Sequence, residues 1–270
     1  MKDIKWKGNR IYQIIVTVLV IVILFSGFGV VRDYLEARRS REEYKRLAEL
    51  AQTETEAQET PTEAETLPEA PYVSPIDFAA LSEINPDIVG WITIPDTNID
   101  YPIVQCGDND KYLKTGFDGE KNRAGTIFLD FESDSDMEGR NNIIYGHNMK
   151  NGTMFKDIVK YKDKAYFDAH QTILLYTPER TIRLKALAAY YDVAKPIARM
   201  TKFKSQESFD QFVKDMITPC SYAQLPDQPI PKIYSLITCS YEINDARTFL
   251  FAAEVDEQGN VITVDEEEGE

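Results

Sequence analysis

The chain has 270 residues, enough for one ordinary domain with appendages or for two small domains, and its 43% hydrophobic content is typical of a globular protein. Its formal net charge is -15, from 45 acidic and 30 basic side chains. A surface of that sign repels phosphate backbones, so the composition argues against a nucleic-acid-binding protein.

An apolar stretch without a single charge, residues 11–31, follows a ten-residue N-terminal segment. As a helix it would span about 31 Å, the thickness of a bilayer core. We therefore expect residues 1–10 to be a cytoplasmic tail and residues 11–31 to be an uncleaved transmembrane signal anchor. A cleaved signal peptide is the alternative, although no Ala-x-Ala site is present. Basic side chains flank the stretch on both sides, so the charge pattern does not settle its orientation.

Residues 32–71 are predicted to form a helical stalk followed by an extended linker. Residues 33–52 contain strong helix formers with charges of both signs and few leucines. Residues 53–71 consist almost wholly of Thr, Glu, Ala and Pro, a composition too polar to fold. Neither part is expected to have a core of its own, so removal of residues 1–71 is expected to leave a folded domain intact.

The folded domain is expected to be mainly β, to span residues 72–262 and to be followed by an acidic tail, residues 263–270. A short helical pattern opens it at residues 76–84. Eight short segments rich in β-branched and aromatic residues are predicted as strands: 90–94, 99–105, 124–130, 142–146, 172–176, 181–190, 232–239 and 248–255. Apolar residues at helical spacing predict one helix among them, at residues 206–217. So many short strands indicate a barrel or a sandwich.

Three side chains that can carry chemistry fall at the ends of predicted strands. Cys239 ends one strand, Arg247 lies at the start of the next, and His147 follows a third. If the last two strands form an antiparallel hairpin, the thiol and the guanidinium lie at the same end of the sheet. A cysteine nucleophile needs a neighbouring His or Arg to favour its thiolate. A guanidinium can also hold a carbonyl oxygen as that oxygen gains charge.

Other classes of site have little support in the sequence. With only two histidines and no Cys-x-x-Cys pair, no metal site is expected, and the absence of a Gly-rich phosphate loop gives no reason to expect a nucleotide cofactor. A lone cysteine in an apolar strand is by default a buried small hydrophobe. His170 is interpreted as a surface or turn histidine. The odd number of cysteines fits one functional thiol and at most one disulfide, between Cys106 and Cys220.

Several blocks of the sequence resemble the sortase family, and class B sortases in particular. The match runs from about Phe78 to Val255 and includes residues 84–92, 98–105, 124–130, 142–149 around His147, and 236–239 with Arg247. The resemblance implies an eight-stranded sortase-type β-barrel with N-terminal helices and a helix inserted before the Cys-bearing strand. No Asp-Pro-aromatic lid precedes the domain, in contrast to the pilus-polymerising class.

The resemblance also implies a reaction on surface proteins that carry a C-terminal sorting motif. Cys239 would attack the Thr carbonyl of the motif, His147 would protonate the leaving amine, and Arg247 would bind the substrate backbone or the oxyanion. A primary amine of peptidoglycan, or of its lipid-linked precursor, would then resolve the thioester. This activity implies a single-pass protein of the cell membrane with its catalytic domain outside the cell.

The same resemblance assigns four residues to the substrate groove: Asn109, Leu113, Tyr145 and Thr238. It favours a motif of the form Asn-Pro-x-Thr or Ser-Pro-x-Thr over Leu-Pro-x-Thr-Gly, because an unpaired Asn109 amide would be left facing a leucine. Ile237 and Ser240 depart from the residues common in class B, Ser and an acidic residue. Two alternatives stay open: a thiol endopeptidase that releases its substrate to water, and a non-catalytic stalked wall-binding module.

Overall fold

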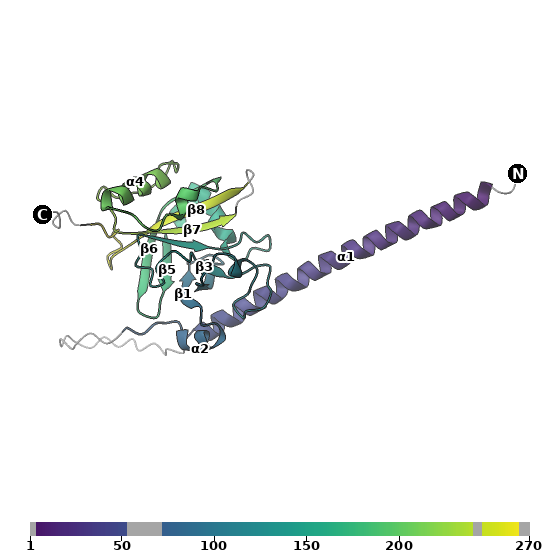
Figure 1. Cartoon of the computed structure of the whole chain (residues 1–270), viewed down its shortest axis with the longest axis horizontal. Helices are drawn as coiled ribbons and strands as arrows, with labels where there is room; N and C mark the ends of the chain where they lie inside the picture. Colours follow the sequence, from purple (N-terminus) through teal and green to yellow (C-terminus); the bar gives the residue numbers. More distant parts are fainter. Residues whose placement is uncertain (1–3, 53–71, 240–244, 265–270) are drawn as a thin grey trace. The chain divides into compact units, whose positions relative to one another are not determined.

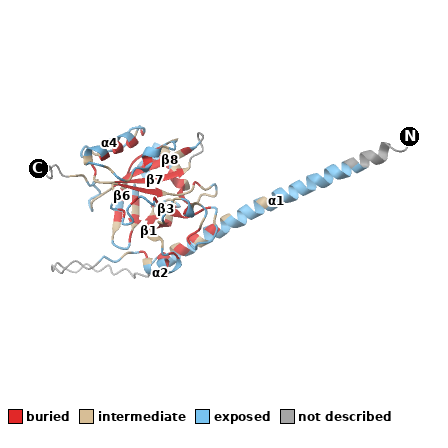
Figure 2. Ribbon diagram, in the orientation of Figure 1, coloured by how far each residue is buried: buried red, intermediate tan, exposed pale blue. Residues whose placement is uncertain are grey.

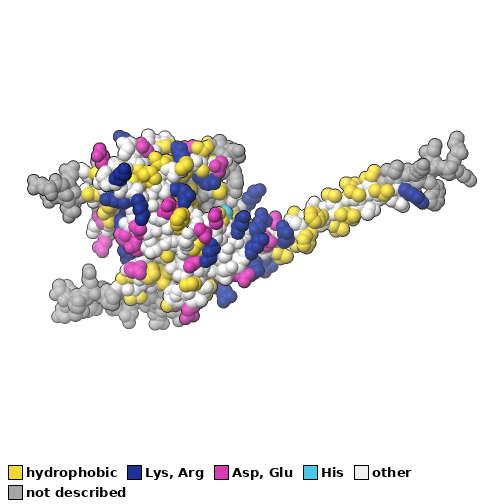
Figure 3. All heavy atoms as spheres, viewed as in Figure 1, with side chains coloured by type: hydrophobic (Ala, Val, Ile, Leu, Met, Phe, Trp, Pro, Cys, Tyr) yellow, Lys and Arg dark blue, Asp and Glu magenta, His cyan; other side chains and the backbone are white. Residues whose placement is uncertain are grey.

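The computed structural model describes residues 4–52, 72–239 and 245–264 and divides the chain into two compact units, Met1–Glu42 and Glu43–Glu270 (Figure 1). The first unit is helical, and its helix α1 (Ile4–Ala51) continues into the second. An 18-residue window of α1 has a mean hydropathy of 3.0, and none of it is buried. Figure 3 shows this apolar stretch followed by basic side chains. By length and composition it fits either a membrane anchor or a signal segment.

A closed eight-stranded barrel forms the centre of the second unit, with the strand order β1-β2-β3-β4-β7-β8-β6-β5. The pairings β2–β3 and β4–β7 are parallel, and the other six are antiparallel. All eight predicted strands are present, which confirms the barrel. Their bounds are β1 (Ile88–Thr93), β2 (Asp100–Val104), β3 (Ile127–Leu129), β4 (Asn141–Tyr145), β5 (Thr172–Tyr176), β6 (Thr181–Val193), β7 (Ile233–Cys239) and β8 (Ala246–Glu254).

Short helices cover the barrel and connect its strands. They are α2 (Phe78–Ile84), η1 (Lys111–Leu113), η2 (Phe155–Lys162), α3 (Lys164–Ala169), η3 (Pro196–Arg199) and α4 (Gln206–Ile217). Helix α4 has the bounds predicted from the sequence and precedes the Cys-bearing strand β7. Ser205 begins it with a capping box, in which its side chain accepts a hydrogen bond from the backbone N–H of Ser208.

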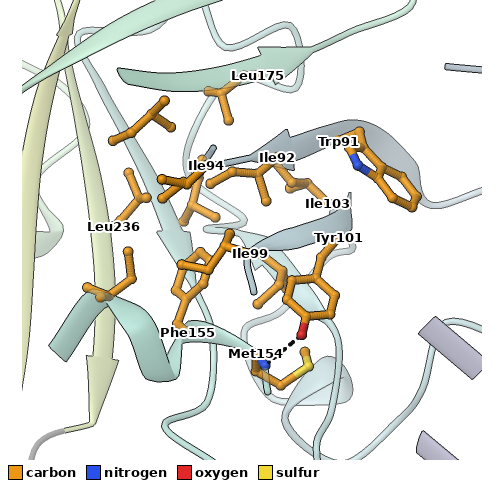
Figure 4. Close-up of a cluster of buried hydrophobic side chains, with 14 of the residues drawn as sticks. Trp91, Ile92, Ile94, Ile99, Tyr101, Ile103, Met154, Phe155, Leu175 and Leu236 are labelled. Carbon is orange, nitrogen blue, oxygen red and sulfur yellow. Dashed lines mark hydrogen bonds between the residues drawn. The ribbon is translucent and has the colours of Figure 1, made fainter. Parts of the chain in front are cut away.

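Apolar side chains fill the barrel and form a second layer beneath α4. Figure 2 shows that buried residues, in red, lie along the barrel strands and on α4. Inside the barrel, Ile92, Ile103 and Leu236 are almost completely buried (Figure 4). The hydroxyl of Tyr101 is satisfied there, because it accepts a 3.0 Å hydrogen bond from the backbone N–H of Met154. The two layers make the barrel a packed support for the strand ends, where loops and side chains reach solvent.

The last turns of α1 belong to the barrel unit and contribute to its core. Tyr44, Leu47 and Ala51 are buried in the main apolar cluster. The hydroxyl of Tyr44 donates a hydrogen bond to the carbonyl of Gly125, and its ring meets the ring of Tyr101 edge-on at 5.3 Å. Residues 33–52 were predicted to have no core of their own, and one helical stripe of this segment is buried in the core of the barrel unit instead. The predicted linker 53–71 and residues 265–270 of the acidic tail lie outside the described residues.

Candidate active site

The three predicted catalytic residues stand level with one another across three neighbouring strands. In the parallel pair β4–β7, Tyr145 lies opposite Ile237. His147 is two residues beyond Tyr145, and Cys239 is two residues beyond Ile237, so the histidine and the cysteine reach the same level. In the antiparallel pair β7–β8, Cys239 lies opposite Arg247. Cys239 is therefore flanked by His147 on one side and by Arg247 on the other.

A cavity of about 290 Å³ opens at these strand ends, and all three side chains line it. The four residues assigned to the substrate groove, namely Asn109, Leu113, Tyr145 and Thr238, line it as well. The other lining residues are Thr126, Phe128, Gly146, Ala194, Lys195, Ala198, Arg199, Ile237 and Phe249. The fold thus brings all seven predicted site residues to one cavity, from segments that are far apart in the sequence.

A backbone carbonyl holds the imidazole of His147. Its Nε2 lies 2.8 Å from the carbonyl oxygen of Leu113, which belongs to η1. A carbonyl oxygen can only accept, so we assign the proton to Nε2, which leaves Nδ1 as the nitrogen that can exchange a proton. The backbone carbonyl of His147 in turn accepts a 2.9 Å hydrogen bond from the N–H of Phe155. The ring is thereby held by η1, and the backbone of His147 by the first residue of η2.

Cys239 ends a strand that is buried up to its last residue. The preceding Thr238 is buried, whereas Cys239 itself is half-buried and faces the cavity. The side-chain amide of Asn148 donates a 2.8 Å hydrogen bond to the carbonyl of Cys239, which fixes the backbone beside the thiol. Within the described part of the chain, the hydroxyl of Thr238 has no hydrogen-bond partner. This hydroxyl is itself buried, so Thr238 contributes to the wall of the cavity without offering a free hydroxyl there.

Arg247 places a partly exposed guanidinium on the other side of the thiol. Its Nη1 donates to the carboxylate of Asp245 at 3.0 Å and to the carbonyl of Ala246 at 3.1 Å. The side chain of Asp245 is 69% exposed, so this ion pair holds the guanidinium only weakly. Arg247 can therefore exchange this contact for a substrate oxygen at little cost.

Comparison with known proteins identifies the family to which this arrangement belongs. The family model for the sortase domain matches residues 92–255. The chain belongs to the sortase family. Sortase B of Listeria monocytogenes is 37% identical over 163 residues, which are 60% of this chain and 66% of that protein. Sortase B of Staphylococcus aureus is 29% identical over 207 residues, which are 77% of this chain and 80% of that protein.

Solved structures lead to the same class. Sortase B from B. anthracis in complex with AAEK1 has a TM-score of 0.68 and 30% identity, over 83% of this chain and 100% of that chain. The Staphylococcus aureus sortase B-substrate complex has a TM-score of 0.69 and 27% identity, over 83% and 99% of the respective chains. These relatives are class B sortases, cysteine transpeptidases that anchor surface proteins, and this chain is a member of that class.

The remaining cysteines of this sortase are free thiols. Cys106 is half-buried, and its Sγ donates to the carbonyl of Asp108 at 3.2 Å. Cys220 is buried in the apolar layer beneath α4. The disulfide considered from the sequence is therefore not formed, and neither residue lines the cavity. His170 does not line the cavity either. It lies at the C-terminal end of α3, where it caps the helix and stacks on Tyr166.

Gly146 is required for the position of His147, because a side chain at position 146 has no room. A Cβ atom would lie 2.4 Å from Cδ1 of Ile127 and 2.6 Å from the ring of Phe155. Gly146→Ala is therefore expected to destabilise the fold by about 1 to 3 kcal/mol and to displace His147. We expect a roughly hundredfold loss of kcat/KM, since misplacement of a reacting group by about 1 Å has that effect.

Thermal unfolding and peptide cleavage measure the two effects of Gly146→Ala. Gly107→Ala is a matched control, because no atom lies within 4 Å of a Cβ built on that glycine. Wild-type activity in Gly146→Ala would show that the segment before His147 can move aside without harm.

A buried carboxylate that the sequence analysis did not single out lies behind one wall of the cavity. Asp130 is completely buried and accepts hydrogen bonds from Asn109 at 2.9 Å, Tyr145 at 2.8 Å and Arg199 at 3.3 Å. Burial and the Asp130 charge raise the pKa of Tyr145, so its hydroxyl stays protonated and donates. In the sequence, Asp130 stands out only as the last residue of the predicted strand 124–130.

The amide of Asn109 is already paired at both ends. Its Nδ2 donates to Asp130, and its Oδ1 accepts from the backbone N–H of Phe131 at 3.1 Å. The expectation that a leucine in the substrate would leave this amide unpaired is therefore corrected. Only one N–H and one carbonyl lone pair of Asn109 remain for a substrate.

Proposed function

We propose that Cys239, His147 and Arg247 carry the transpeptidation, acting on a sorting motif of class B type in surface proteins outside the cell. The observation that supports this most strongly is the alignment of the three groups on β4, β7 and β8 at one cavity. An inert wall-binding module would have no reason to place a half-buried thiol between an imidazole and a guanidinium. Membership in the sortase family points the same way.

In the first half of the proposed reaction, the Cys239 thiolate attacks the carbonyl carbon of the motif Thr. The carbonyl oxygen becomes an oxyanion, and the guanidinium of Arg247 stabilises its charge. The C–N bond then breaks, and His147 gives its proton to the departing amine. A thioester between Cys239 and the Thr carbonyl remains.

In the second half, a primary amine attacks the thioester carbonyl. His147 accepts a proton from the amine, the new amide bond forms, and the Cys239 thiolate leaves. One related structure is a sortase B complexed with triglycine. For this chain we propose an amine of peptidoglycan or of its lipid-linked precursor. The apolar helix α1 would then anchor the protein in the membrane, with the barrel on the outer side.

The test of this function is the product formed by the full chain in detergent micelles. We expect a peptide with the sequence Asn-Pro-x-Thr-Asn to be cleaved after Thr and, when triglycine is present, to be joined to it. Mass spectrometry separates this product from the free acid. Formation of the free acid alone would identify a thiol endopeptidase. Absence of cleavage across a panel of sorting peptides would contradict both activities.

We also expect a preference for this peptide over Leu-Pro-x-Thr-Gly. Asn109, Tyr145 and Arg199 bring polar groups to the cavity, and a polar first residue of the motif can pair with them whereas a leucine cannot. A mismatch between a polar wall and an apolar side chain is worth about 1 to 3 kcal/mol, or roughly five- to a hundredfold in kcat/KM. Competition between the two peptides in one reaction measures the ratio. Faster use of the Leu-Pro peptide would refute the class B preference and leave the thiol mechanism in place.

A further inference from the structure

We propose that Asp130 is a positioning residue that sets the substrate affinity of the cavity by fixing its polar wall, which consists of Asn109, Tyr145 and Arg199. This inference rests on the proposed function, because the affinity concerned is that for the sorting motif. Asp130 does not line the cavity, so it acts only through the three residues that do.

The three donors come from three separate parts of the fold and meet at one oxygen atom. Asn109 lies between β2 and η1, Tyr145 ends β4, and Arg199 ends η3. All three donate to Oδ2 of Asp130. Its other oxygen, Oδ1, accepts a 3.0 Å hydrogen bond from the backbone N–H of Glu132. Both carboxylate oxygens therefore accept hydrogen bonds, and the Asp130 carboxylate is the one group to which all three wall residues are bonded.

The bond to Asp130 determines which atoms of the Asn109 amide face a bound substrate. The amide could rotate by half a turn only if it lost its bonds to both Asp130 and the N–H of Phe131. With the bonds in place, the amide cannot exchange its oxygen and nitrogen, and the hydrogen-bonding pattern of the wall stays constant. A fixed donor pattern raises affinity, because the substrate does not have to order the wall when it binds.

Arg199 is the part of the wall that most needs an anchor. It lies in the long connection between β6 and β7, and its side chain is 48% exposed. The backbone of η3 is held to β4 by Asn141, whose amide donates to the carbonyls of Ala198 and Met200. The guanidinium itself depends on Asp130, whose completely buried carboxylate accepts from Nε at 3.3 Å, because its other acidic neighbour, Glu132, is exposed and 4.0 Å away. Without Asp130 the Arg199 side chain would gain many conformations.

An asparagine at position 130 keeps the shape of the side chain but cannot reproduce these bonds. Its NH₂ group must face either the N–H of Glu132 or the three donors on the wall, so donor meets donor in either orientation. We expect Asp130→Asn to raise KM for the Asn-Pro-x-Thr-Asn peptide about 10- to 100-fold. The value of kcat should change less than about threefold, since the groups that react are not displaced.

The experiment compares the full-length wild-type chain, Asp130→Asn and Asp134→Asn in detergent micelles. Asp134→Asn is the matched control, because it removes the same charge from an exposed position nearby. It should stay within about twofold of wild type in both constants. The rate of alkylation of Cys239 by iodoacetamide should be equal in all three, which a general loss of structure would not allow. In an Asn109→Ala background, Asp130→Asn should raise KM by a smaller factor, because the hydrogen bond through which Asp130 fixes Asn109 is already absent.

Peptide binding separates this inference from the proposed function. In the Cys239→Ala chain, the dissociation constant of the peptide should rise about 10- to 100-fold when Asp130→Asn is added, whether or not the wild-type protein turns the peptide over. A wild-type chain without turnover would contradict the function alone. Unchanged affinity, or a loss confined to kcat, would overturn the role of Asp130. If Asp130→Asn does not fold, Tyr145→Phe removes one donor to the same carboxylate, and unchanged affinity there has the same meaning.

Discussion

Cys239→Ala is expected to abolish formation of the acyl-enzyme and cleavage of the sorting peptide, while the fold remains intact. The substitution removes one sulfur atom from a half-buried position at the mouth of a cavity, so it leaves no void in the core. Mass spectrometry of the protein after incubation with peptide detects the thioester, and circular dichroism reports on the fold. Cys106→Ala serves as the matched control, because that thiol is free and lies outside the cavity.

The two neighbours of the thiol should be nearly as important. His147→Ala removes both the group that favours the thiolate and the proton donor for the leaving amine, which is expected to lower kcat by about 10²- to 10⁴-fold. Arg247→Lys keeps the charge but loses the planar fork, and we expect a loss of about 10²- to 10³-fold. Near-normal turnover of the lysine variant would remove Arg247 from the reaction. Unchanged cleavage by Cys239→Ala would end the thiol mechanism.

Two truncated chains should differ sharply in stability. Removal of residues 1–42 leaves Tyr44, Leu47 and Ala51 in place, whereas removal of residues 1–71 takes all three out of the core. Loss of one large buried side chain costs about 2 to 5 kcal/mol, so the shorter protein should be less stable by at least about 3 kcal/mol. Urea unfolding of the two proteins measures this difference.

The shorter protein should also lose activity. The hydroxyl of Tyr44 lies 3.3 Å from the hydroxyl of Thr126, which lines the cavity, and donates to the adjacent carbonyl of Gly125. Without Tyr44, this wall of the cavity has fewer fixed contacts. Equal stability and equal activity of the two truncated proteins would show that the end of α1 is dispensable, and would restore the boundary at residue 72 that the sequence suggested.

The regular parts of the fold could be predicted because their signals are local. Enrichment in β-branched and aromatic residues marked all eight strands, and helical spacing of apolar residues marked α4 with its bounds. Helices η1, η2, α3 and η3 were missed. In η2 the buried residues Phe155, Ile158 and Tyr161 recur every third residue, which is the repeat of a 3₁₀-helix and not of an α-helix. The stripe of Tyr44, Leu47 and Ala51 was too short to stand out from a polar helix.

For the site, too, residues with a local sequence signal could be predicted, and residues defined by a long-range contact could not. Cys239, His147 and Arg247 were predicted because each lies at a strand end and matches the sortase resemblance, which also supplied the groove residues, and the structure places all of them at one cavity. Asp130 and Arg199 could not be found that way, because their importance comes from a contact between residues about seventy positions apart. Spacing along the chain carries no information on such a contact. The same holds for the paired state of the Asn109 amide, which only the structure reveals.

The parallel pairing of β4 with β7 also determines when the enzyme becomes competent during its synthesis. The two strands are separated by roughly ninety residues, and a contact of such high order forms late in folding. A ribosome delivers the imidazole of His147 long before the thiol of Cys239, and the guanidinium of Arg247 comes last. Until then, β4 has a free edge and no nucleophile beside it. Under the proposed mechanism, a nascent or clipped chain that ends before β7 lacks the nucleophile, so peptide cleavage is expected only from chains in which β7 has been made and can pair with β4.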